Sequence, residues 1–112
     1  MRSILAVVAA VALTLVFFFV GQTPAGDPEA GEALASGCAS CHGSDGIASV
    51  DRYPSLAGQN EGYLLKALQA YQNGNRRGGQ ATVMHGQVSG LSKKQLRDLA
   101  AYYAAMPRTG AK

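Results

Sequence analysis

Several features that mark other classes of protein are absent from this sequence of 112 residues. No alternating polar and apolar stretch is long enough for a β-strand, since the best candidate, residues 81–84, is short and lies between glycines. Basic residues are scattered, with no run longer than two and no interleaved aromatic residues, which predicts a solvated surface and no nucleic-acid partner. Internal repeats and low-complexity linkers are missing too. The sequence therefore predicts one small all-α domain.

Cysteine is also scarce, because Cys38 and Cys41 are the only two. A disulfide between residues three apart would close too short a loop to stabilise a fold. A structural zinc site needs four ligands, and the distant His85 is the only further histidine besides His42. A redox C-x-x-C motif normally lies near a strand–helix pattern, which this chain lacks. The two cysteines therefore call for another explanation.

That explanation is the C-x-x-C-H motif formed by Cys38, Cys41 and His42. This spacing is the attachment signature of a c-type haem, in which each thiol forms a thioether with one vinyl group of the porphyrin. The imidazole after the second cysteine can then bind the iron as proximal ligand. The motif predicts one covalently attached haem c. The haem would give a small domain of about 87 residues the apolar centre that it otherwise lacks.

The N-terminus has the layout of an export signal. Arg2 precedes residues 4–20, which are apolar except for one threonine, and residues 21–25 are polar and turn-prone. This predicts a secretory signal peptide cleaved near residue 25. The 17-residue apolar run is also at the lower limit for a membrane span, so an uncleaved anchor that associates with the membrane remains an alternative. Both interpretations divide the chain into residues 1–25 and an exported, periplasmic domain of residues 26–112.

Two helices are predicted in the first part of that domain. Asp27 and Pro28 form an N-cap and first helical position, and this first helix is expected to reach Cys38. The second helix is predicted over residues 60–73, with Gly74 ending it. Apolar residues at helical spacing are Ala30, Ala33, Leu34 and Cys38 in the first, and Leu64, Ala67, Leu68 and Tyr71 in the second.

The third predicted helix begins after residue 92. Ser92 and Gln95 have the spacing of a capping box, with Leu91 and Leu96 placed as the hydrophobic staple. Its apolar stripe consists of Leu99, Tyr102, Tyr103 and Met106, and a proline follows. The sequence therefore predicts three main helices packed around one haem.

A six-coordinate iron needs a second axial ligand, and Met84, His85 and Met106 are the candidates in the exported part. Met106 ends an apolar helical stripe, where a role in the core is expected. Met84 is expected in an irregular glycine-rich loop that can carry its thioether over the haem. Neighbours in an extended segment point in opposite directions, so only one of Met84 and His85 faces the haem. The residues favour an exposed His85 but leave the ligand open.

These motifs together resemble those of monohaem class I cytochromes c, specifically bacterial cytochrome c553 and the single domains of cytochrome c4. The resemblance covers nearly the whole exported part. It rests on C-A-S-C-H-G at 38–43, P-S-L-A-G-Q at 54–59, residues 73–76, Met84, and residues 91–92 and 99–103.

The resemblance implies roles for particular residues. In such cytochromes the ligand methionine lies seven residues before the apolar residue that opens the last helix, which corresponds here to Met84 and Leu91. The resemblance also implies that the carbonyl of Pro54 accepts the ring N–H of His42, and that Leu56 lines the haem.

The function implied is that of a periplasmic carrier of one electron between respiratory redox partners, which it contacts transiently. The haem iron would have His42 and Met84 as axial ligands, which leaves no open site for a substrate and argues against an enzyme. One alternative is a membrane-anchored haem subunit of an oxidase or dehydrogenase complex, supported by residues 4–20. Another is an enzyme or gas sensor in which Met84 dissociates, for which the sequence offers no distal polar group.

Overall fold

The computed structural model describes residues 25–109, and all regular secondary structure in that range is helical, as predicted. The elements are α2 (Pro28–Leu34), the 3-10 helix η1 (Ala35–Gly37), α3 (Ala39–His42), α4 (Glu61–Gln72), α5 (Ala81–Val88) and α6 (Lys93–Ala104). Within these residues no helix has the length and apolar character needed to cross a membrane. The predicted export segment, residues 4–20, lies outside the described residues.

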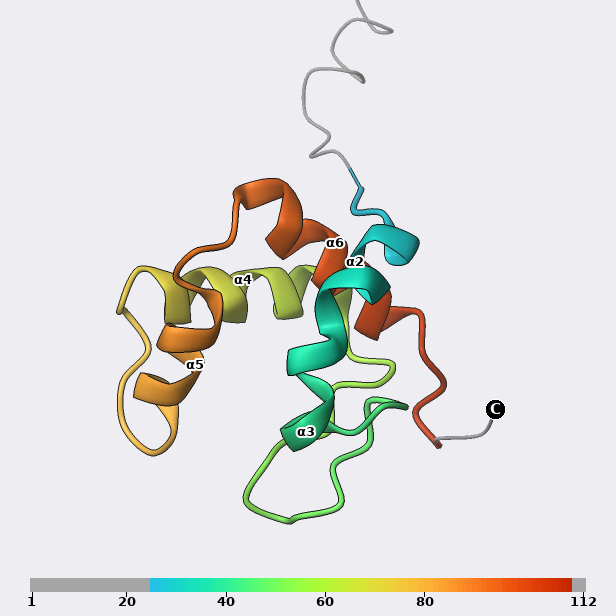
Figure 1. Cartoon of the computed structure of the whole chain (residues 1–112), viewed down its shortest axis with the longest axis horizontal. Helices are drawn as coiled ribbons and strands as arrows, with labels where there is room; N and C mark the ends of the chain where they lie inside the picture. Colours follow the sequence, from blue (N-terminus) through green and yellow to red (C-terminus); the bar gives the residue numbers. More distant parts are fainter. Residues whose placement is uncertain (1–24, 110–112) are drawn as a thin grey trace, which may run out of the picture.

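The helices are arranged around α6. Helix α2 packs against α6, and α4 packs against both α6 and α5. In Figure 1, α5 lies below one end of α4, while α3 and the long loop that follows it lie below the centre of the molecule. The buried core lies where α2, η1, α4 and α6 meet and consists of Ala35, Leu64, Leu99, Ala100 and Tyr103.

The first helix begins as predicted but ends earlier. Asp27 caps α2, with its carboxylate accepting a hydrogen bond from the Glu29 amide at 3.0 Å. The predicted continuous stripe is wrong, because the α-helix ends at Leu34 and Ala33 is exposed. The chain continues as the 3-10 helix η1, which ends at Gly37, a residue with poor helix propensity.

The second and third predicted helices are confirmed as α4 and α6. Gly74, with φ of +77°, follows α4 in the left-handed region that ends helices. At the start of α6, the Ser92 hydroxyl accepts from the Gln95 amide at 3.1 Å, and the Gln95 side chain accepts from the Ser92 amide at 2.9 Å. Both bonds of the capping box are therefore present. Leu96 in the first turn of α6 is completely buried.

The expected irregular loop around Met84 is the main error in the predicted secondary structure. Residues 81–88 form helix α5, which contains both Met84 and His85. Local signals for this helix are weak, because Gln80 does not cap it with its side chain and Gly86 lies inside it. A helix this short is marginal in isolation, so its packing against α4 stabilises it.

Candidate haem site

The short helix α3 holds the C-x-x-C-H motif together. Cys38 is its N-cap, and the backbone N–H groups of Cys41 and His42 bond to the Cys38 carbonyl at 3.2 and 3.0 Å. Residues three and four apart in a helical turn share one face. All three side chains accordingly line the same cavity. Both thiols are free, so neither is consumed in a disulfide.

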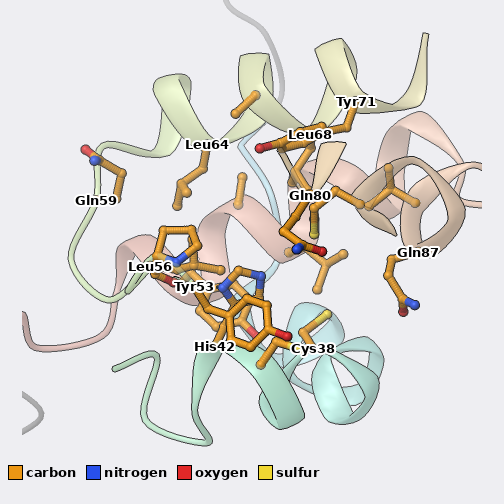
Figure 2. Close-up of a pocket in the computed structure, with 18 of the residues that line it drawn as sticks. Cys38, His42, Tyr53, Leu56, Gln59, Leu64, Leu68, Tyr71, Gln80 and Gln87 are labelled. Atoms are coloured by element: carbon orange, nitrogen blue, oxygen red, sulfur yellow. Dashed lines mark hydrogen bonds between the residues drawn. The ribbon is translucent and has the colours of Figure 1, made fainter. Parts of the chain in front are cut away.

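The imidazole of His42 is held in one orientation. His42 is only 6% exposed, and its Nδ1 lies 2.8 Å from the carbonyl oxygen of Pro54. A carbonyl can only accept, so Nδ1 carries the proton and Nε2 keeps its lone pair. This bond, which the resemblance predicted, fixes the ring and makes Nε2 a better donor to a metal. Figure 2 shows the His42 ring among the side chains that line the cavity.

The cavity itself has a volume of about 350 Å³ and is mainly apolar. Its walls come from the end of α2, η1, α3, the loop after α3, and helices α4, α5 and α6. Apolar residues expected to lie around a haem line it: Leu34, Leu56, Leu64, Ala67, Leu68, Tyr71, Leu99 and Tyr103. Figure 2 shows Leu64 and Leu68 on the side of α4, and Leu56 beside His42 on the other side of the space.

The three candidate axial ligands are separated by the structure. Met84 is half-buried on α5 and lines the cavity. His85 is exposed, is absent from the cavity lining, and its Nδ1 lies 2.9 Å from the Tyr71 carbonyl oxygen. Met106 follows α6 and packs against the core cluster instead of lining the cavity. The structure thus brings Met84, and neither of the other two, to the same cavity as the C-x-x-C-H motif.

Sequence reasoning missed several polar groups in this cavity. Burial raises the pKa of the Cys38 thiol, while a hydrogen bond from the Tyr103 hydroxyl opposes that shift. Burial also raises the pKa of Tyr103, so its hydroxyl remains a neutral donor. Tyr103 was predicted only as part of an apolar stripe, because helical periodicity reports which face is buried and does not report what a hydroxyl bonds to.

Arg76 and three side-chain amides, those of Gln59, Gln80 and Gln87, also line the cavity. The Arg76 guanidinium lies 4.8 Å from the centre of the Tyr71 ring, close enough for a cation–π contact. Gln80 directly precedes α5 and Gln87 lies on it, and Figure 2 shows both side chains. The sequence could not predict that Arg76, Gln80 and Gln87 line the site, because this depends on the packing of α5 against α4.

The donor groups fit a covalently attached haem. Two free thiols lie one helical turn apart, and a buried imidazole between apolar walls uses Nδ1 for Pro54, which leaves Nε2 for a metal. Two free thiols, which would form the thioethers, and one neutral imidazole are the groups that c-type attachment and proximal ligation require. Cys38, Cys41 and His42 are therefore the residues that would hold the haem.

Comparison with known proteins agrees with this geometry. Residues 28–106 match the sequence profile of the Cytochrome c family. The chain is 43% identical to cytochrome c-554(548) of Halomonas halodenitrificans over 72% of this chain and 98% of that protein. It is also 43% identical to cytochrome c4 of Pseudomonas aeruginosa, over 72% of this chain but only 39% of that protein.

A solved structure shows the same fold. The crystal structure of reduced recombinant cytochrome c4 from Pseudomonas stutzeri superposes with a TM-score of 0.66 and 39% identity, covering 74% of this chain and 47% of that one. This chain thus spans less than half of each of these two cytochrome c4 proteins. The fold and site define a haem-containing electron-transfer protein. The chain belongs to the cytochrome c family, and its cofactor is covalently bound haem c with its iron.

Proposed function

We propose that this protein carries one electron on a haem whose iron has His42 and Met84 as its two axial ligands. The single observation that carries the proposal is that both side chains line one apolar cavity from different elements. In Figure 1, α3 and α5 lie on either side of the space below α4. Two protein ligands leave no open position for a substrate, which supports electron transfer over catalysis.

Bound haem c supplies a one-electron ferric–ferrous couple. His42 contributes a fixed, electron-rich nitrogen, because Pro54 holds its Nδ1 proton. Met84 contributes a soft sulfur, which favours the reduced state and raises the potential. Leu56, Leu64 and Leu68 keep water from the ring. The charge of the haem would therefore change in apolar surroundings that exclude water, which favours fast electron transfer.

We further propose an exported, periplasmic protein that contacts its donor and acceptor transiently, with residues 1–25 as signal peptide and residues 26–112 as the cytochrome domain. A membrane-anchored haem subunit is the second candidate, favoured by the apolar run at residues 4–20. The intact mass of the purified protein distinguishes the two, since it reports covalent haem and cleavage together. A mass that includes residues 1–25, recovered in the membrane fraction, supports the anchored form.

Replacing the sixth ligand tests the main proposal. Met84→Ala should lower the potential, allow carbon monoxide to bind the reduced protein and abolish the weak long-wavelength sulfur-to-ferric-iron absorption band. Met106→Leu is the matched control, since it removes a sulfur from the core while nearly conserving volume, and it should keep the band. Survival of the band in Met84→Ala, with its loss in Met106→Leu, would show that the ligand assignment is wrong.

A further inference from the structure

Helix α5 is a wall of the haem cavity that is packed against the protein on one side only. Its fully buried side chains are Ala81 and Val88, at its two ends, and most of the residues between them are exposed. Among the described helices, α4 is its one substantial packing partner. The link from α4 to α5 is exposed from residue 75 to 80 and includes Gly78 and Gly79, both with positive φ. Neither apolar burial nor the link therefore fixes α5 strongly.

Hydrogen bonds from the end of α4 hold α5 in place where apolar burial is small. Gln72, the last residue of α4, donates from Nε2 to the Val88 carbonyl at 3.0 Å and to the Leu91 carbonyl at 2.7 Å. Both acceptors are carbonyls, so the amide nitrogen must be the atom that faces them. Val88 ends α5, and Leu91 directly precedes the cap of α6. One side chain thus connects three helices.

Gln72 is half-buried and does not line the haem cavity. It therefore acts on the site only through α5, which carries Met84 one helical turn before Val88. A second contact to α4, from His85 Nδ1 to the Tyr71 carbonyl, lies on the same helix. Helix α5 is held at its C-terminal half by these bonds.

We propose that Gln72 is a positioning residue for the sixth ligand, because its amide holds α5 so that the Met84 sulfur stays on the iron. This inference rests on the proposed function. Without the two hydrogen bonds, α5 should move away from α4 more often and release the methionine more often. Each such bond changes an equilibrium by at least roughly threefold, so losing both predicts a rise of about tenfold or more in the open population.

Cyanide binding to the ferric holoprotein measures that opening, because cyanide can bind only after the methionine leaves. Gln72→Glu keeps the shape but places oxygens opposite two carbonyls, and Gln72→Met keeps the length without a donor. Both should bind cyanide faster than the unmodified protein, by about tenfold or more. Gln69→Glu is the matched control, since Gln69 is exposed on α4 and its side chain makes no hydrogen bond within residues 25–109, and it should change the rate less than twofold.

A second background separates positioning from general loosening. In Met84→Ala the sixth position is already open, so adding Gln72→Met should leave cyanide binding unchanged. Equal acceleration in both backgrounds, or no acceleration in either Gln72 variant, would overturn the inference, as would loss of haem from both Gln72 variants. Slow cyanide binding in Met84→Ala itself would instead overturn the proposed ligand and this inference together.

Discussion

The carboxylate of Asp98 on α6 accepts a hydrogen bond from the backbone N–H of Asp27 at 2.8 Å, across 71 positions of the chain. The same carboxylate lies 2.6 Å from the ammonium of Lys94, one helical turn earlier. Asp98 is only 3% exposed, so both contacts replace water. A side chain of the last helix therefore fastens the start of the first described helix.

This contact predicts a specific dependence of stability on pH. The amide of Asp27, and then Lys94, lower the pKa of Asp98 from its ordinary value of 3.8. A lowered pKa in the folded protein stabilises it above pH 3.8, and this contribution disappears as the pH falls through the folded value. Asp98→Ala should therefore lower the melting temperature by several degrees at pH 7. In acid, the melting temperatures of the variant and the unmodified protein should differ less, because the carboxylate of the unmodified protein is then protonated.

Lys94→Gln provides the control for the Asp98 measurement. The Lys94 side chain is 66% exposed, and exposed ion pairs contribute little. The bond from Asp27 remains in this variant, so the melting temperature should change by only a degree or two. A loss as large as that of Asp98→Ala would mean that the ion pair, and not the backbone contact, stabilises the fold.

A second prediction concerns the close approach of α2 to α6. A methyl group at Gly31 would overlap the Asp98 carbonyl oxygen and lie 2.8 Å from Cβ of Tyr102. Gly31→Ala should therefore separate the helices and destabilise the protein by about 2 kcal/mol. Gly62→Ala on α4 meets no atom within 4 Å and should stabilise by about 0.5 kcal/mol through helix propensity. Denaturant titration of both variants tests this, and a neutral Gly31→Ala would contradict the tight contact.

Sequence patterns predicted those parts of the fold that local signals specify. The cap at Asp27, the capping box at Ser92 and the stop at Gly74 are each contained within a few residues, and the structure has all three. The bond between His42 and Pro54 was predicted only through the resemblance to a family, since it joins residues twelve apart through a loop.

What the patterns missed depends on contacts between distant segments. Helix α5 lacks a capping side chain and is held by Gln72, which comes from another helix. The bond from Tyr103 to Cys38 likewise requires that α6 lie beside η1 and α3. Such contacts have no periodicity in the chain, so no window of sequence can reveal them.

Attachment of the haem gives a third prediction. Each thiol can form one thioether, so Cys38→Ala or Cys41→Ala should retain haem through a single bond. The double variant should lose all its haem to acidified acetone, which extracts only haem that is not covalently bound. Haem that resisted extraction from the double variant would exclude attachment through these residues. The apoprotein should be largely unfolded, as measured by circular dichroism, because the cavity occupies the centre of a small core.

The fourth prediction concerns docking to redox partners. Residues 26–112 contain nine lysines and arginines and seven acidic residues, a formal charge of +2 that two haem propionates would offset. The rate of electron transfer should therefore depend only weakly on ionic strength, because charge steering requires a strong field. Stopped-flow measurement with one acidic and one basic partner protein, from low to high salt, checks this.

Arg77→Gln is the better variant for testing a local basic patch in that experiment. Arg76 stacks on Tyr71 and lines the cavity, so replacing it would change more than charge. Arg77 is exposed, and its Nε donates to the Gly74 carbonyl at 3.3 Å. A steep salt dependence that Arg77→Gln removes would show that this patch governs docking.

The acceptor that holds His42 is a main-chain atom of residue 54. Every amino acid at that position brings a carbonyl, so no single substitution can delete the bond outright. Proline adds a fixed φ and the absence of a competing N–H, which keep the carbonyl directed at the ring. In the proposed haem site, the hydrogen bond that orients His42 is thus protected against point mutation at residue 54. The contacts proposed to hold Met84 depend on side chains such as Gln72, so single substitutions that adjust the midpoint potential are expected there.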